Sequence, residues 1–367
     1  MRIADLRVYR CRVPLRSPYA SMAVPLTDEA SVLLVELVTD TGERGWGEAA
    51  PISWLGETPA GAEAALSGPL RRTLTGRDLA DFDELLGAAE QAAPGEMAAL
   101  AGVDLALHDL LGRQRGTPLH RLLGAGEGDG ELTTCMTLGL GPLEAMKARV
   151  AECVAEGFTI LKLKVGTDVD EDLDRVRAVR AAAGTGVRLW LDANGRWTPG
   201  TAIRVLGRMA DEGLDIELVE QPVPAKDLAG LAEVRRGVRP LVVADESVVR
   251  EQDAVDVVTR EAADVLNVKL HKNGGIRAVR RIIDVAERAG ITCMIGCTLE
   301  TTVSATAAAA VAAASGRVAF VDLDAPLWLR DSPVIGGAVY AGPRIRLPEA
   351  AGLGIEGPAR KLVPCAG

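Results

Sequence analysis

Three acidic residues stand between two lysines along this chain, and each of the five closes or directly follows a short apolar run. In chain order they are Lys164, Asp192, Glu220, Asp245 and Lys269. Carboxylates that converge on one point repel one another unless a cation lies between them, and hard oxygen ligands favour Mg²⁺. Zinc is disfavoured because these positions offer neither cysteine nor histidine. We therefore predict one Mg²⁺ per subunit, held by the three acids.

The lysines predict proton transfer beside a metal-bound carboxylate. Lys162 and Lys164 lie two residues apart in a predicted strand, so both point to one face of it. Close like charges lower the pKa of at least one of them, which gives a base usable near neutral pH. Lys269 ends a later strand and should face the same pocket from the opposite side. One base can then remove a proton and the other return it to the opposite face, with the metal stabilising the enediolate between the two steps.

The spacing of these positions is typical of a barrel of alternating strands and helices. With Cys297 and Asp322 added, neighbours in the series lie 24 to 28 residues apart, and a strand with its crossover helix and loops takes about 25–30 residues. The C-terminal ends of barrel strands converge on one mouth, where active sites lie. On the pattern alone, an open doubly wound sheet is the alternative. The predicted strands cover residues 132–138, 159–165, 187–192, 216–220, 240–245, 263–269, 291–297 and 317–322.

The two ends of the chain have a different pattern. Residues 1–50 indicate an antiparallel meander, and residues 59–123 are helical in pattern. The glycine-rich segment 124–130 marks a boundary, but it is not in GxGxxG register between a strand and a helix, so it does not predict a dinucleotide site. After Asp324 the helical pattern stops. The predicted domains are an α+β capping domain of residues 1–125, completed by residues 326–367, and a barrel of residues 126–325.

Composition excludes several classes of protein. The formal net charge is −10 and the basic residues are scattered, which argues against a nucleic-acid partner. The N-terminus lacks the apolar core of a signal peptide, and the longest bland stretch, residues 303–315, is too short to cross a membrane. The six cysteines form no CxxC pair, which predicts reduced thiols in a cytoplasmic protein. The partner that remains is a small-molecule substrate.

These motifs resemble those of the enolase superfamily, and within it the muconate-lactonizing-enzyme-like subgroup. The matching elements are Lys162-Leu163-Lys164, the three acids in Asp-Ala-Asn, Glu-Gln-Pro and Asp-Glu-Ser contexts, and Lys269, where the subgroup places its second base. The resemblance covers essentially the whole chain and implies an α+β capping domain over a modified (β/α)7β barrel. Asn194 and Glu246 of these contexts are expected to surround the metal ligands. Many members form homo-oligomers, so self-association is expected by resemblance alone.

Asp322-Leu323-Asp324 closes the last predicted strand with two acids on one face. At the mouth and away from the metal they could bind a substrate ammonium, or they could merely cap a loop. The motif resembles the Asp-x-Asp of dipeptide epimerases of the L-Ala-D/L-Glu type, where these acids bind the dipeptide's α-ammonium and its carboxylate chelates Mg²⁺. By that resemblance Lys164 and Lys269 exchange the α-proton of the C-terminal residue, and Lys162 helps to neutralise its carboxylate. Cys297 is assigned to the neighbourhood of the substrate.

The side chain of the epimerised residue is expected to be small or hydrophobic rather than acidic. No lysine or arginine stands between Arg16 and Arg44, and an acidic substrate side chain would need a nearby cation. Trp54 could add an apolar wall or pack at the domain interface. The candidate residues of the first loop are Tyr19, Met22, Val24, Asp28 and Glu29.

Other activities use the same lysines and metal. Within the subgroup they are cycloisomerase, o-succinylbenzoate synthase, N-acylamino acid racemase and cis-3-hydroxyproline dehydratase. The dehydratase is the strongest rival because an imino acid also carries a cationic nitrogen. Outside the superfamily, the alternative is a Schiff-base aldolase that uses Lys164 or Lys269. The activity of such an aldolase would persist in the presence of a chelator. A metal-stabilised binding module without catalysis would keep its function after Lys269→Ala.

Overall fold

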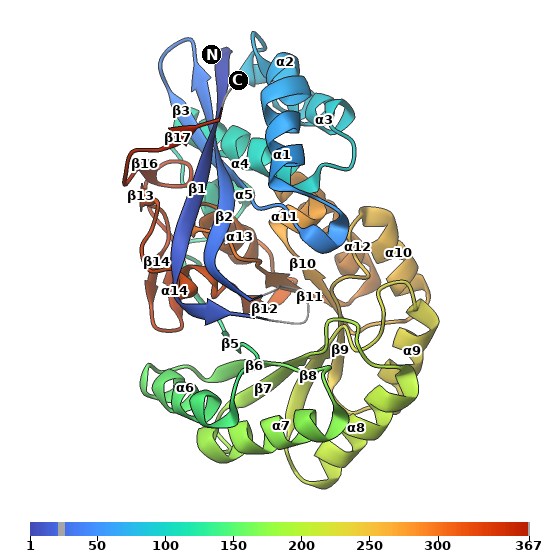
Figure 1. The fold of residues 1–367 in the computed structure, drawn as a ribbon. Coiled ribbons are helices and arrows are strands. Elements are labelled where there is room, and N and C mark those ends of the chain that lie inside the picture. Colours follow the sequence, from blue (N-terminus) through green and yellow to red (C-terminus); the bar gives the residue numbers. More distant parts are fainter. Residues whose placement is uncertain (21–25, 366–367) are drawn as a thin grey trace.

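An antiparallel sheet forms the N-terminal part of the molecule in the computed structural model, which describes residues 1–20 and 26–365. Strands β1 (Ile3–Tyr19), β2 (Thr27–Thr39) and β3 (Arg44–Ala49) form the predicted meander. Strand β17 (Val363–Pro364), from the far end of the chain, pairs with β1. The two chain ends therefore lie close together at this sheet (Figure 1).

Helix α4 (Met97–Gln114) packs against this sheet and is buried along nearly its whole length. Its sequence is apolar on almost all sides, as a buried helix requires. Gly47 of β3 allows a close approach, because a Cβ there would lie 1.9 Å from the carbonyl oxygen of Gly102 in α4. The other helical segments of this part are η1 (Ser53–Leu55), α1 (Pro59–Ala65), η2 (Leu66–Leu70), α2 (Arg71–Leu74), η3 (Leu79–Asp81), α3 (Phe82–Ala92) and α5 (Leu119–Leu123).

A barrel of parallel strands forms the rest of the core (Figure 1). Over the described residues, its eight strands neighbour one another in chain order from β5 to β12, with helices between them. A doubly wound sheet would reverse its order at a switch point, so the barrel prediction is confirmed and the open sheet is excluded. The strands are β5 (Met136–Leu138), β6 (Ile160–Lys164), β7 (Arg188–Asp192), β8 (Ile216–Glu220), β9 (Leu241–Ala244), β10 (Val265–Val268), β11 (Thr292–Gly296) and β12 (Val318–Asp322). The helices are α6 (Leu143–Ala155), α7 (Val169–Ala183), α8 (Pro199–Asp211), α9 (Leu228–Gly237), α10 (Glu251–Thr259), α11 (Leu270–Asn273), α12 (Ile276–Ala289) and α13 (Thr302–Ala313).

The first predicted strand, residues 132–138, is in fact two short strands. β4 (Glu131–Thr133) pairs with β15 (Arg344–Arg346) near the end of the chain, whereas β5 belongs to the barrel. Between them, the N–H of Cys135 donates to the carbonyl oxygen of Val321 at 3.1 Å. This bond brings the start of the first barrel strand against the last one.

The barrel interior has an apolar layer and, nearer the mouth, a polar layer. In the apolar layer Trp190 packs edge-on against Phe320, with ring centroids 5.7 Å apart. Because side chains alternate along a strand, a residue two positions further on also points inward, closer to the mouth. Asp192 follows Trp190 in this way, and Asp322 follows Phe320. The apolar layer consists of Cys135, Ile160, Trp190, Leu218, Val243, Val265, Met294 and Phe320.

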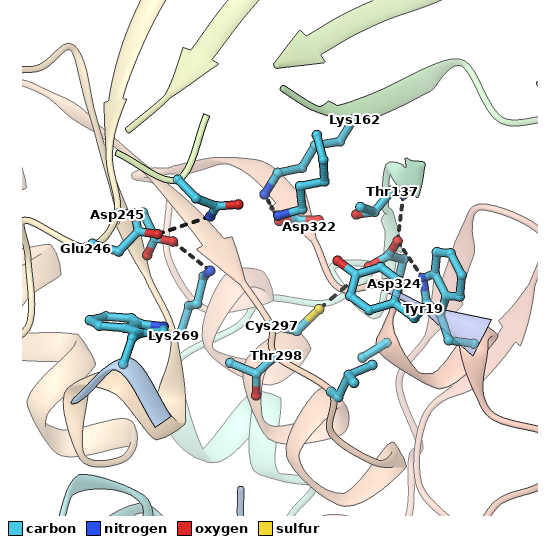
Figure 2. Close-up of a pocket in the computed structure, with 16 residues that line it drawn as sticks. Tyr19, Thr137, Lys162, Asp245, Glu246, Lys269, Cys297, Thr298, Asp322 and Asp324 are labelled. Atoms are coloured by element: carbon cyan, nitrogen blue, oxygen red, sulfur yellow. Dashed lines mark hydrogen bonds and ion pairs between the residues drawn. The ribbon is translucent and has the colours of Figure 1, made fainter. Parts of the chain in front are cut away.

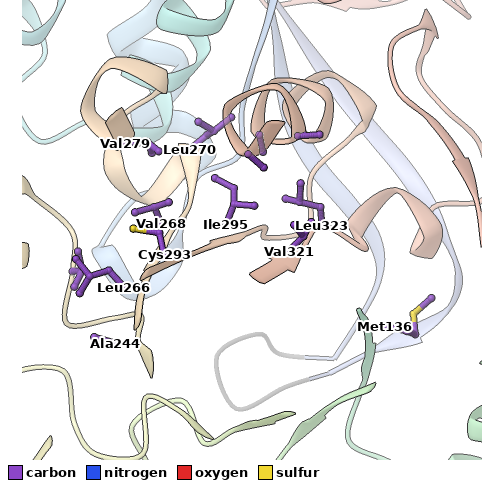
Figure 3. Packing of buried hydrophobic residues seen from close by; sticks show 14 of the residues in the cluster. Met136, Ala244, Leu266, Val268, Leu270, Val279, Cys293, Ile295, Val321 and Leu323 are labelled. Atoms are coloured by element: carbon purple, nitrogen blue, oxygen red, sulfur yellow. The ribbon is translucent and has the colours of Figure 1, made fainter. Parts of the chain in front are cut away.

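The outer face of the barrel strands is also apolar, because helices cover it. Figure 3 shows Val268, Ile295 and Val321 of successive strands packed together with Leu270 and Val279 of the neighbouring helices. Strands that are buried on both faces explain the nearly continuous apolar runs in the sequence.

The C-terminal tail contacts both parts of the molecule. It contributes β17 to the N-terminal sheet and β15 to a small sheet with β4. The predicted domain boundaries at residues 125/126 and 325/326 stay a prediction. Of the helices described, none is long and apolar enough to span a membrane. The remaining tail elements are α14 (Ala325–Trp328), β13 (Val334–Gly336), β14 (Val339–Ala341) and β16 (Ile355–Pro358).

Candidate active site

Three buried carboxylates lie on adjacent strands at the mouth of the barrel. Asp192 and Glu220 end β7 and β8 and are level with each other in the parallel pairing. Asp245 directly follows β9. The three residues are at most 1% exposed. Removal from water makes their mutual repulsion strong, so positive charge has to lie close by.

Lysine ammoniums supply that charge from two sides of the barrel. Lys164 ends β6 and its Nζ lies 2.6 Å from Asp192 Oδ2. Lys269 follows β10 and its Nζ lies 2.8 Å from Asp245 Oδ2, as Figure 2 shows. In the strand order, β6 and β10 stand on opposite sides of the barrel. Gly296 of β11 leaves room for the second lysine, because a Cβ there would lie 2.8 Å from Lys269 Cε.

The prediction that close like charges lower a lysine pKa is wrong for this structure. Burial lowers the pKa of Lys164, but Asp192 and the other acidic groups around it together outweigh burial and the repulsion from Lys162, so the pKa is raised. Burial likewise lowers the pKa of Lys269, and Asp245 together with Glu220 and Glu246 more than reverses that effect. Both side chains therefore carry a proton at neutral pH. The sequence gives the distance between two lysines on one strand, but not the carboxylates that the next strand brings against them.

The carboxylates themselves show why a cation suits this place. Burial and then the charge of Asp192 raise the pKa of Glu220 to about 8. Burial also acts to raise the pKa of Asp192, but Lys164 and Lys162 lower it to about 2. The Nζ of Lys162 lies 2.7 Å from Glu220 Oε2 and 3.3 Å from Asp192 Oδ2. Positive charge thus already bridges two of the three acids.

The donor set fits a hard divalent cation in its chemistry. It offers carboxylate oxygens from adjacent strand ends and no sulfur or imidazole, which is the ligand type that Mg²⁺ prefers. Across residues 1–20 and 26–365, no three acidic, histidine or cysteine side chains stand close enough together to hold a metal ion as they are. The triad is turned toward its lysines instead. The assignment of Asp192, Glu220 and Asp245 as Mg²⁺ ligands stays a prediction.

Several residues that hold the triad in place were missed in the sequence. The fully buried Lys272 donates to Asp245 Oδ1, to the Asp245 carbonyl oxygen and to the Asn267 carbonyl oxygen, each at 2.7 Å. The Asn267 side chain donates to Glu220 Oε1 at 2.8 Å. The Gln221 side-chain oxygen accepts the N–H of Asp245 at 2.9 Å. The signals were present, since Asn267 lies two residues before Lys269 on the inward face and Gln221 directly follows a ligand.

Asn194 and Glu246 lie beside the triad and line the same pocket as Lys269. The Asn194 amide nitrogen donates to Glu246 Oε1 at 3.0 Å. Asn194 has a left-handed backbone (φ 42°), and its N–H donates to Asp192 Oδ1 at 3.0 Å. A short polar side chain tolerates this conformation, which accounts for asparagine two residues after a ligand.

The two acids of the last strand have different surroundings. Asp322 Oδ2 lies 2.7 Å from Lys162 Nζ, so Asp322 is next to the triad and the prediction that it stands away from the metal residues is wrong. Asp324 does lie away from them. Its Oδ2 accepts the N–H of Thr137 at 2.7 Å and Nε1–H of Trp328 at 3.2 Å. Two residues along a strand share a face but differ in depth, and here the deeper acid reaches the lysine.

Asp324 forms part of a pocket wall with aromatic and sulfur-containing neighbours (Figure 2). Cys297 Sγ lies 3.7 Å from Asp324 Oδ1. The rings of Tyr19 and Trp328 meet edge-on with centroids 4.8 Å apart. Burial raises the pKa of Asp324, and the charge of Asp322 raises it further. A cation in this pocket would relieve both effects.

The capping part contributes apolar surface to the pocket. Trp54 is 39% exposed and lines the pocket together with Tyr19 and Leu299, so the wall interpretation of Trp54 is favoured over the packed one. The basic residues among the described lining residues are Lys162, Lys164 and Lys269, all of which face carboxylates. Asp28 and Glu29 are not among the lining residues that the structure describes. The candidates Met22 and Val24 lie outside the described residues.

Replacing Glu300 by glutamine is expected to stabilise the protein near pH 8. Glu300 is 1% exposed, and burial followed by the charge of Glu48 raises its pKa from 4.5 to about 8. The folded state therefore holds this proton more tightly than the unfolded state. The contribution to stability is complete below about pH 4.5 and is lost as the pH rises to about 8. Glutamine cannot ionise, so the variant should gain on the order of 4 kcal/mol over wild type at pH 8, since each unit of pKa shift corresponds to about 1.4 kcal/mol.

Urea unfolding at pH 5 and pH 8 measures this effect, with Glu144→Gln on the exposed side of α6 as the control. An equal difference between Glu300→Gln and wild type at both pH values would contradict the prediction.

The fold and the site together define a class of enzymes. A modified (β/α)7β barrel with acids and lysines at its mouth, under an α+β cap, is the architecture that the sequence motifs implied. The family model "Mandelate racemase / muconate lactonizing enzyme, N-terminal domain" matches residues 3–124, and "Enolase C-terminal domain-like" matches residues 145–360. The chain belongs to this mandelate racemase and muconate lactonizing enzyme family of the enolase superfamily.

Individual relatives narrow the comparison. An L-Ala-D/L-Glu epimerase from Clostridium acetobutylicum is 40% identical over 358 residues, which cover 97% of this chain and 99% of that protein. A substrate-liganded structure of L-Ala-D/L-Glu epimerase from Bacillus subtilis matches with a TM-score of 0.95 and 37% identity, over 98% of this chain and all of the other. The chain is an enzyme, an isomerase like these relatives.

Enterococcus faecalis provides a third comparison. Its hydrophobic dipeptide epimerase is 40% identical over 361 residues, covering 97% of this chain and 100% of that protein. A structure of a dipeptide epimerase from the same organism, in complex with Mg and the dipeptide L-Leu-L-Tyr, matches with a TM-score of 0.92 and 38% identity, over 97% of this chain and 99% of the other.

Proposed function

We propose that this chain is a Mg²⁺-dependent dipeptide epimerase that transfers a proton at the carbon alpha to a carboxylate. The observation that carries the proposal is the position of Lys164 and Lys269 on opposite sides of the barrel mouth, with the acidic triad between them. Two opposed amines suit removal of a proton from one face of a carbon and its return to the other. The relatives that act on dipeptides support the same activity.

The proton transfer uses the two lysines in opposite protonation states. The neutral amine of one lysine takes the α-proton: an N–H bond forms as the Cα–H bond breaks, and the bonding pair moves into the carboxylate to give an enediolate. The ammonium of the other lysine then donates its proton to the opposite face of the same carbon. The Cα–H bond is restored with inverted configuration, and the two lysines have exchanged protonation states.

Asp192, Glu220 and Asp245 are the proposed ligands of the metal. When bound, Mg²⁺ supplies positive charge that neutralises the substrate carboxylate and stabilises the enediolate. Lys162, which lies between Glu220 and Asp322, adds charge for the same carboxylate. An Asp192 carboxylate shared with a cation would hold the Lys164 proton less tightly, which lowers the pKa of that lysine toward a usable base. Asn194 and Glu246 would orient the ligands beside which they lie.

Asp324 is the proposed partner of the substrate's free α-ammonium. It lies on the pocket wall with one oxygen toward Cys297, and burial without a full counter-charge raises its pKa. Asp322 adds negative charge nearby, but its own carboxylate is paired with Lys162. Cys297 then lies beside the N-terminal part of the dipeptide.

The epimerised residue is proposed to have a small or hydrophobic side chain. Tyr19, Trp54 and Leu299 form an apolar side of the pocket. The lysines among its described lining residues already form ion pairs with carboxylates of the protein. An acidic side chain would be desolvated there without a partner, which is costly.

A mixed dipeptide library in deuterated water with Mg²⁺, read by mass spectrometry, tests the proposed function. Dipeptides with a small or hydrophobic C-terminal residue should gain one deuteron. The highest kcat/KM for Ala-Glu would overturn the side-chain preference. Loss of water from cyclic imino acids, with no dipeptide exchanging, would replace the epimerase by the dehydratase.

Replacing Asp324 by asparagine is expected to remove the preference for a free N-terminal ammonium. The kcat/KM for a free dipeptide should fall about 100-fold, because a charged hydrogen bond in a buried site is lost. An N-acetylated analogue, which offers no ammonium, should change by less than about 3-fold. Asparagine retains an oxygen for Thr137 and Trp328, and Asp331→Asn on the surface is the control. An equal fall in kcat/KM for both substrates would show that Asp324 does not bind the ammonium.

A further inference from the structure

Glu48 connects the N-terminal sheet to the barrel through a buried carboxylate. It lies on β3, is fully buried, and reaches the start of α13. Its Oε1 accepts the N–H of Thr301 at 2.8 Å, and its Oε2 accepts the Thr301 hydroxyl and, at 3.4 Å, the N–H of Ser304. The carboxylate thus occupies the N-terminus of a helix that belongs to the other part of the molecule. A carboxylate suits this place because it only accepts hydrogen bonds and lies at the positive end of the helix dipole.

The segment that Glu48 fixes leads directly into the pocket wall. Cys297, Thr298 and Leu299 line the pocket just before α13 begins. Next to them, Glu300 Oε2 accepts both the N–H and the hydroxyl of Thr298 at 3.3 Å. The wall is therefore anchored at its C-terminal end by Glu48 and stiffened within itself by Glu300.

A second contact joins the same strand to the lysine side of the pocket. The N–H of Ala50, two residues after Glu48, donates to His271 Nδ1 at 3.4 Å. Nδ1 is then the acceptor nitrogen, so the ring proton lies on Nε2, which is 3.6 Å from Glu300 Oε2. His271 belongs to α11, two residues after Lys269. Strand β3 and the residue that directly follows it thus contact both the wall segment and the helix that follows the second base.

We propose that Glu48 is a positioning residue that holds the Thr298–Leu299 wall against the capping part and so sets how tightly the pocket encloses the substrate side chain. The statement about the substrate rests on the proposed function, whereas the statement about the wall does not. Glu48 touches neither the triad nor the lysines in any of its described hydrogen bonds. Its effect should therefore appear in binding and selectivity more than in the chemical step.

Asp109 of helix α4 offers a matched control, because it contacts the same strand. It is a fully buried carboxylate that accepts the N–H of Trp46 in β3 at 2.8 Å and the N–H of Leu353 at 2.7 Å. Its contacts tie β3 to the C-terminal tail and do not involve the wall. Asp109→Asn should therefore cost stability as Glu48→Gln does, without loosening residues 297–304.

Hydrogen exchange of the full-length protein without substrate tests the wall directly. In Glu48→Gln the side-chain NH₂ opposes one of the donors, and the amides of residues 297–304 should exchange at least ~10-fold faster. Asp109→Asn should leave those amides within about 2-fold of wild type. Equal exchange of this segment in the two variants overturns the proposal, whatever reaction the enzyme catalyses. If Glu48→Gln does not fold, Thr301→Val removes the hydroxyl donor from the other side of the contact and is judged by the same criterion.

Kinetics with the dipeptide that the library identifies test the consequence for selectivity. Glu48→Gln should raise KM roughly 10-fold and change kcat less than about 3-fold, because the bases stay in place. The ratio of kcat/KM between a bulky and a small C-terminal residue should move toward 1. A loss confined to kcat, or an unchanged ratio, overturns the role in selectivity. An absence of turnover with every dipeptide in wild type counts against the proposed function, and the exchange experiment still decides the role of Glu48.

Discussion

Lys269→Ala is expected to lower the rate of epimerisation by at least ~10³-fold while one stereoisomer still exchanges its α-proton with solvent. Lys269 and Lys164 stand on opposite sides of the barrel, so each faces one side of the substrate carbon. Without Lys269 the proton can leave and return only on the side of Lys164. The dipeptide whose α-proton points to that side should gain deuterium without inversion, and its epimer should not exchange.

The mirror experiment makes the prediction specific. Lys164→Ala should abolish epimerisation to the same extent and leave exchange in the opposite epimer. Both variants should fold, because each carboxylate that loses a lysine retains a second ion pair. Asp245 still pairs with Lys272, and Asp192 still pairs with Lys162. The surface variant Lys147→Ala is the control for a change of net charge. Retained epimerisation in Lys269→Ala would contradict the role of Lys269 as a base, and equal exchange of both epimers in either variant would contradict opposed bases.

Glu220→Gln is expected to weaken Mg²⁺ binding by roughly 100-fold and to reduce epimerisation accordingly. Glutamine preserves the shape and the acceptor for Asn267, but it removes one of the three charges that a cation would neutralise. Chelation of the metal should likewise stop the wild-type reaction, and added Mg²⁺ should restore it. Titration with Mg²⁺ or Mn²⁺ by calorimetry or electron paramagnetic resonance measures the affinity without relying on turnover.

The matched control lies on the same strand. Glu217→Gln changes a glutamate of β8 that pairs with Arg188 and Trp190 at the opposite end of the strand, and it should leave metal affinity unchanged. Full epimerase activity of wild type in excess chelator would remove the metal from the mechanism.

The barrel and the residues at its mouth were predictable from the sequence alone. The near-constant spacing of polar strand ends predicted the barrel and its mouth, because a strand and its crossover helix need a nearly fixed length of chain. The alternation of side chains placed Lys162 and Lys164 on one face, and it places Trp190 below Asp192. These inferences use only distances along the chain, and the structure agrees with them.

What surrounds each group was decided by contacts between distant segments. The carboxylate of Asp192 keeps the pKa of Lys164 high, although the pair of lysines alone predicted a lowered value. Lys272 of α11 donates to Asp245, and Glu48 contacts Thr301 although 253 residues separate the two along the chain. The protonation state of a side chain depends on the local dielectric and on the nearest charges in three dimensions. The sequence therefore determined which residues meet at the mouth of the barrel. The tertiary structure decided which of them are charged and which partners hold them.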